Sequence, residues 1–110
     1  MNIENIAHAH KEQFSDEFLN WLPENAHIWI AFEQETYKVI KAGFKHYSAR
    51  TIIHVLRHHS ALSEQGDSGW KINNNISPYL ARLFAILNPT HADLFEYREA
   101  KRARLDGLTR

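Results

Sequence analysis

Side chains suited to phosphate groups are concentrated in residues 36–63, a stretch without aspartate or glutamate. It carries five basic residues and four histidines: Lys38, Lys41, Lys45, Arg50, Arg57, His46, His54, His58 and His59. Nucleic acid presents a dense row of negative phosphates, and proteins that bind it gather lysine and arginine on one face. The one-sided charge therefore predicts a phosphate-contacting surface, provided that the local structure brings these side chains together.

Other kinds of chemistry have weaker support. His54 and His58 are four residues apart, which places two imidazoles on one face of a helix, as in some zinc sites. No HExxH motif supplies the rest of such a site, so we expect neither a metal nor a cofactor. Ser68 in GDSGW lacks the spacing of a hydrolase nucleophile, and the basic stretch offers no carboxylates for general acid–base catalysis. We predict that the protein is not an enzyme.

Two helices joined by a turn would position the basic residues. The first begins near Asn25 or Ala26 and ends at Gly43, because glycine suits the left-handed conformation that closes a helix. The second opens at Ser48, a favoured N-cap residue. Residues expected on the inward faces of the two helices recur at helical spacing: Ile28, Phe32, Thr36, Val39, Ile40, Gly43, Ala49, Ile52, Ile53, Leu56 and Ser60.

This pattern has the outline of a helix-turn-helix reader of double-stranded DNA. Two features depart from the usual pattern. Lys38 stands where an apolar residue is normal, and four residues between Gly43 and Ser48 make the turn long. Domains of this type usually bind DNA as dimers, so a homodimer is expected, with the C-terminal helix or the acidic N-terminal third as the interface.

The second helix would enter the major groove. Its outward residues Arg50, Thr51, His54 and Arg57 would address base edges, while lysines on neighbouring segments would hold phosphates. The full set of predicted DNA-binding residues is Lys41, Lys45, Tyr47, Ser48, Arg50, Thr51, His54, Arg57, His58, Lys71, Asn73 and Asn74.

The rest of the chain predicts a mainly α fold with four or five helices. Residues 1–14 read as a polar tail or frayed helix, and residues 15–108 as a single helical domain in which Ser15 caps a helix. Residues 63–76 hold a turn and the alternating run Trp70-Lys71-Ile72, which predict a small β-hairpin (a wing) or an irregular excursion. Ser77-Pro78 starts another helix, and Thr90 caps a last one.

The neutral total charge hides a polarised distribution. Residues 1–35 have one base and seven acids, a balance of −6, whereas residues 36–91 have seven bases and two acids, a balance of +5. The acidic third either leaves the basic middle exposed or packs beside it and neutralises it. The second case favours a different class of function, a small helical protein–protein interaction module that serves as an adaptor or inhibitor. The absence of cysteine, of an apolar run that could span a membrane and of a signal-peptide pattern leads us to expect a cytoplasmic protein.

Three segments carry a family resemblance: HYSARTIIHVLRHH, WKINNNISPYLARLFAILNP and HADLFEYRE. In these, over about residues 43–99, the chain resembles a family of short uncharacterised bacterial proteins. The resemblance implies one compact bacterial domain, with a phage or another mobile element as one source. It implies no activity, because no function of that family can be transferred to individual residues.

Overall fold

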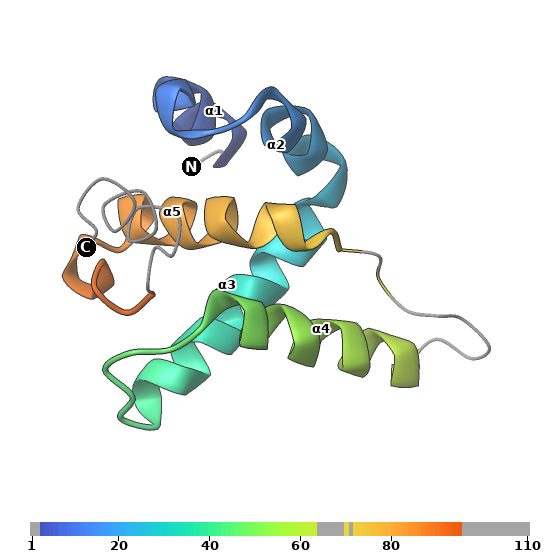
Figure 1. Ribbon diagram of the computed structural model, residues 1–110, viewed down its shortest axis with the longest axis vertical. Coiled ribbons are helices and arrows are strands. Elements are labelled where there is room, and N and C mark those ends of the chain that lie inside the picture. The colour runs from blue at the N-terminus through green and yellow to red at the C-terminus, as the bar shows by residue number, and fades with distance from the viewer. Residues whose placement is uncertain (1–2, 64–69, 71, 96–110) are drawn as a thin grey trace, which may run out of the picture.

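The chain is mainly helical, which confirms the mainly α part of the predicted fold class. Figure 1 shows the computed structural model, which describes residues 3–63, 70 and 72–95. The described α-helices are α1 (Ile3–Ala9), α2 (Asp16–Trp21), α3 (Ala26–Lys41), α4 (Ala49–Ser63) and α5 (Ser77–Leu87). Short 3-10 helices are η1 (Lys11–Gln13), η2 (Leu22–Asn25), η3 (Asn74–Ile76) and η4 (Pro89–His91). No helix within the described residues is both long and apolar enough to cross a bilayer.

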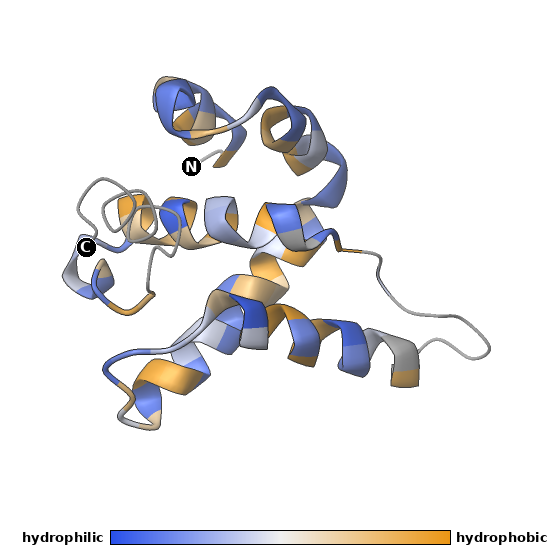
Figure 2. Ribbon diagram, in the orientation of Figure 1, coloured by the Kyte–Doolittle hydropathy of each residue, from blue (hydrophilic) through white to orange (hydrophobic). Residues whose placement is uncertain are grey.

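Helix α3 is the centre of the arrangement. It contacts both α4 and α5, and α4 also contacts α5. In Figure 1, α1 and α2 lie on one side of α5, whereas α4 lies on the opposite side. Hydrophilic and hydrophobic residues alternate along α4 in Figure 2, as expected for an amphipathic helix that buries one face and exposes the other.

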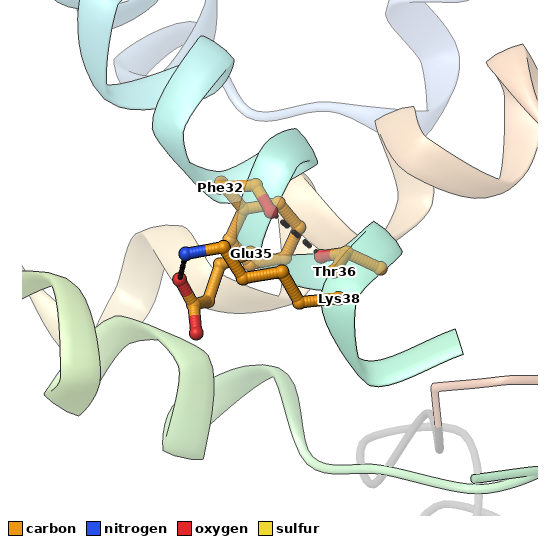
Figure 3. A network of polar contacts seen from close by, with 4 residues as sticks. All are labelled: Phe32, Glu35, Thr36 and Lys38. Atoms are coloured by element: carbon orange, nitrogen blue, oxygen red, sulfur yellow. Dashed lines mark hydrogen bonds and ion pairs between the residues drawn. The ribbon is translucent and has the colours of Figure 1, made fainter. Parts of the chain in front are cut away.

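The core is built from large apolar side chains on the inner faces of α3 and α5. Trp29, Phe32 and Phe84 are almost completely buried, and the Phe32 ring lies 5.6 Å from that of Phe95. Thr36 is the polar residue of this stripe, and it is fully buried. Its hydroxyl donates a hydrogen bond of 2.7 Å to the Phe32 carbonyl (Figure 3), so the buried donor is satisfied without a break in the helix.

Helices α1 and α2 close the other side of α5. The predicted Ser15 cap is present, since the backbone N–H of Phe18 donates to Ser15 Oγ over 3.1 Å. Phe18 is fully buried, and its ring stacks at 5.1 Å on that of Phe14, which is also buried. Ala7 of α1 belongs to the same core. The N-terminal residues thus contribute apolar area to the core that α3 and α5 form.

No wing hairpin is shown. Residues 64–69 and Lys71 of the expected hairpin lie outside the described residues, and Trp70 and Ile72 are not in a strand. Instead, the backbone N–H of Trp70 donates to Ser60 Oγ over 2.8 Å, and the Ile72 carbonyl accepts a hydrogen bond from the Arg57 guanidinium. Their backbone polar groups therefore bond to side chains of α4, where a hairpin would pair them with a second strand.

The last predicted helix does not begin at Thr90. This residue lies inside η4, which is followed by a turn and then by Leu94 and Phe95, both buried in the core. The Leu94 carbonyl accepts the backbone N–H of Tyr47 over 2.9 Å, and Phe95 forms a parallel bridge with Tyr47. This pairing with a distant segment replaces the local hydrogen bonds that a helix would need, so tertiary packing overrides the capping signal. Residues 96–110 lie outside the described residues.

Candidate nucleic-acid interface

The turn between α3 and α4 orients the basic residues. Gly43 has φ +98°, a left-handed conformation that residues with a Cβ adopt only at a cost. Its N–H donates to the Ile40 carbonyl, and that of Phe44 to the Val39 carbonyl, which is the pattern of a Schellman motif. The chain then needs residues 42–48 to reach α4, a longer connection than the usual three- or four-residue turn of a helix-turn-helix.

Helix α4 starts as the sequence predicts. Ser48 Oγ accepts the backbone N–H of Thr51 at 3.4 Å, and the Ser48 carbonyl accepts that of Ile52. Ile52 and Ile53 are completely buried, together with Leu56. Since these three residues fix which side of α4 faces inward, they also fix which side chains face solvent.

Apart from Ser48, which caps α4, six predicted DNA-binding residues are exposed around the turn and on the outer side of α4. They are Lys41, Lys45, Arg50, Thr51, His54 and His58, and we refer to them as the basic face. The side chains of Lys41, Lys45 and Arg50 make no hydrogen bond or ion pair within the described part of the chain. Their charges are therefore available for a partner.

Other predicted site residues have structural contacts. Arg57 is half-buried and ties α4 to the segment before η3 through the Ile72 carbonyl. Tyr47 is half-buried and packs against the core. Asn73 is exposed, and its Oδ1 accepts the backbone N–H of Asn75 over 2.9 Å at the start of η3. Asparagine side chains often satisfy nearby backbone groups in this way.

The remaining predicted DNA-binding residues are Ser48, Lys71 and Asn74. Ser48 is exposed and caps α4. Lys71 and the side chain of Asn74 lie outside the described residues. The structure thus brings together the residues of the turn and of α4, and it does not add Arg57 or Tyr47 to their exposed surface.

Four exposed residues of the turn were not in the predicted set, and two of them, Phe44 and His46, carry a ring. Phe44 is 53% exposed, and its ring meets that of Tyr47 edge-on at 5.2 Å. His46 is exposed beside Lys45. The available sequence signal for Phe44 was its position directly after the glycine that ends α3, in an otherwise polar turn.

A groove of about 250 Å³ separates part of α3 from part of α4. It lies along the flank of α4, and Glu35 and Lys38 of α3 line it. Figure 3 shows these two side chains on α3. No group of three or more histidine, aspartate or glutamate side chains within the described residues could hold a metal ion.

Glu33, also on α3, provides a test of local electrostatics. Burial raises the pKa of its carboxyl above the ordinary value, because desolvation disfavours the charged form. When the pKa of a carboxyl is higher in the folded than in the unfolded protein, its contribution to the free energy of unfolding is fully present at pH values below the pKa in the unfolded protein. That contribution is lost as the pH rises through the pKa in the folded protein. We therefore expect Glu33→Gln to raise the melting temperature at neutral pH by at most about 4 °C. The gain should vanish near pH 4, roughly where glutamate is protonated in unfolded chains.

Circular dichroism melts at the two pH values would measure this difference. Glu12→Gln is the matched control, because Glu12 is exposed on η1 and should show no comparable gain. A lower melting temperature for Glu33→Gln at neutral pH would contradict the assignment of a desolvation penalty to this carboxyl.

Comparison with known proteins yields no match to a family model, to a curated protein or to a solved structure. The family resemblance of residues 43–99 stays a prediction. Any functional assignment therefore has to come from the residues themselves, and the basic face is the feature with the clearest chemistry.

Proposed function

We propose that the protein binds double-stranded DNA through the basic face of α4 and the preceding turn. The observation that carries the proposal is the exposure of six residues with suitable chemistry in a stretch that contains no acid between Thr36 and Ser63. Three of them, Lys41, Lys45 and Arg50, are permanent cations without partners in the described part of the chain.

The position of each residue along α4 and the turn determines which part of the DNA it would contact. An α-helix fits the major groove of B-form DNA, and helix-turn-helix domains contact base edges with the N-terminal part of the second helix. Arg50, Thr51 and His54 are exposed in the first two turns of α4, so they are the base-contacting residues in this proposal. Lys41 and Lys45 flank the turn and would contact phosphates, which fixes the orientation of the helix.

Three exposed acidic residues of the N-terminal part support the same orientation. Glu12, Asp16 and Glu17 are exposed on η1 and α2, which lie on the opposite side of α5 from α4 (Figure 1). Acidic charges on the far side of a small domain repel DNA only weakly, because salt screens electrostatic interactions beyond about 10 Å at moderate ionic strength. The same charges orient the protein so that its basic face turns toward the DNA. A net charge of zero is therefore compatible with one-sided DNA binding.

Fluorescence anisotropy of labelled duplex DNA across a salt series tests the proposal. If Lys41 and Lys45 each neutralise one phosphate, the logarithm of the binding constant should fall against that of salt with a slope of about −2. Absence of binding at low salt would refute DNA binding, because non-specific phosphate attraction is strongest there.

A second candidate, the helical protein-interaction module, has one specific observation in its favour. Phe44 and Leu62, at the two ends of the α4 region, are exposed by 53% and 71%. Exposed large apolar side chains are frequent in protein interfaces, including those of homodimers. This candidate predicts no DNA binding at low salt, and self-association or partner binding that Phe44→Asp or Leu62→Asp weakens, measured by analytical ultracentrifugation.

A further inference from the structure

Three residues give the groove between α3 and α4 its apolar surface. Ala31 of α3, the buried Leu56 of α4 and Trp70 line it, and its volume is about 250 Å³. Pockets for drug-sized ligands measure about 300–1,000 Å³, so this groove suits a smaller molecule with a single ring or a branched chain.

Trp70 is held in place on the wall of this groove. Its backbone N–H donates to Ser60 Oγ over 2.8 Å, and the Ser60 hydroxyl in turn donates to the Arg57 carbonyl over 3.0 Å. The indole also meets the His27 ring edge-on at 5.3 Å. An aromatic wall fixed in this way favours an apolar or cationic group over an anion, because the face of an indole carries negative electrostatic potential.

Glu35, Lys38 and His59 are the ionisable residues that line the groove, and Glu35 is its carboxylate. The Glu35 side chain is only 19% exposed, and its partner within the described residues is Lys38, at 3.4 Å. Lys38 is 70% exposed, so its ammonium can move into water at little cost. Figure 3 shows both side chains on the flank of α3, with the Glu35 carboxylate beside the Lys38 ammonium. Glu35 is therefore a largely sheltered carboxylate whose present partner is exchangeable.

From this combination we propose that the groove binds a small molecule with a primary ammonium and an apolar body. The ammonium replaces that of Lys38 on Glu35, and the apolar body covers Ala31, Leu56 and Trp70. Simple amines and free apolar amino acids share this chemistry. An amino acid gains a second contact, because its carboxylate meets the displaced Lys38 ammonium. The proposal does not depend on DNA binding, since none of these residues belongs to the basic face.

Proton–nitrogen correlation NMR of the labelled full chain tests the proposal, with phenethylamine as the first probe. The indole N–H signal of Trp70 is assigned as the one that Trp70→Phe removes. Saturable shifts of this signal are expected, with a dissociation constant on the order of 1 mM for so small a ligand. Hydrocinnamate, which has a similar body with a carboxylate in place of the ammonium, should produce none. Tighter binding of L-phenylalanine than of phenethylamine would identify the amino acid as the preferred source.

Glu35→Gln and Glu33→Gln form the decisive pair of variants. Both remove one carboxylate from α3, but Glu33 does not line the groove. Glu35→Gln should weaken phenethylamine binding about tenfold or more, whereas Glu33→Gln should leave it unchanged. The proposal is overturned if the Trp70 signal shows no saturable shift with the wild-type chain, if hydrocinnamate binds equally well, or if both variants behave alike. Dispersed spectra of each variant confirm that it is folded.

Discussion

Replacing Phe84 by alanine is expected to lower the free energy of unfolding by about 3–5 kcal/mol, within the range for large aromatic residues in protein cores. Phe84 is completely buried. Its ring lies 5.8 Å from that of Phe95 and 5.5 Å from that of Tyr37, both in edge-to-face geometry. One ring thus joins α5 to α3 and to the segment after η4. A domain of this size has only about 5–15 kcal/mol of total stability, so the variant should unfold at a much lower urea concentration.

Urea unfolding followed by far-ultraviolet circular dichroism measures the effect. Phe44→Ala is the matched control, because Phe44 is 53% exposed and its truncation leaves no buried cavity. Its cost should stay within about 1 kcal/mol. Equal losses for the two variants would mean that Phe84 is not a core residue, and the described packing of α5 against α3 would then be wrong.

Local sequence patterns predicted the elements that position the basic face. The inward stripes of α3 and α4 appear where their helical spacing puts them, except that Gly43 lies beyond the end of α3 and is exposed. Ser15 and Ser48 cap their helices through side-chain hydrogen bonds. Such features depend on residues within four positions of one another, so a single sequence contains the required information. Gly43 was also predictable, because glycine after a helical stripe commonly adopts the left-handed conformation that ends a helix.

Features that depend on distant residues were not predictable. Thr90 has the residue type of a helix cap, but no α-helix starts at Thr90. The Leu94 carbonyl instead accepts the backbone N–H of Tyr47, which is 47 positions earlier in the chain. Arg57 falls on the outward side of α4 by spacing alone, yet its long side chain reaches the Ile72 carbonyl. The sequence contains neither of these contacts in a recognisable form, because each depends on how a later segment folds back onto α4 or the turn. The groove lined by Glu35 and Trp70 belongs to the same class.

Two arginines on α4 should therefore behave in opposite ways when each is replaced by alanine. Arg50→Ala should weaken binding to duplex DNA by about tenfold to a hundredfold, the range for an arginine that contacts a base, and leave stability almost unchanged. Arg50 is exposed and makes no hydrogen bond or ion pair within the described residues, so the fold loses little when it is removed. Arg57→Ala should lower the free energy of unfolding by about 1.5–3 kcal/mol, because a charged donor to the Ile72 carbonyl is lost.

Anisotropy titrations across a salt series, paired with urea unfolding of the same variants, separate the two roles. Arg57→Ala should keep the salt slope of the wild-type chain as long as the protein is folded, because this side chain is not part of the basic face. Lys11→Ala is the control for total charge, since Lys11 is exposed on η1 away from α4, and its removal should change neither measurement substantially. If Arg50→Ala and Lys11→Ala reduced DNA affinity equally, attraction would depend on net charge alone, and α4 would have no special place in binding. If Arg57→Ala reduced affinity without loss of stability, its contact with Ile72 would be secondary to a role at the DNA surface.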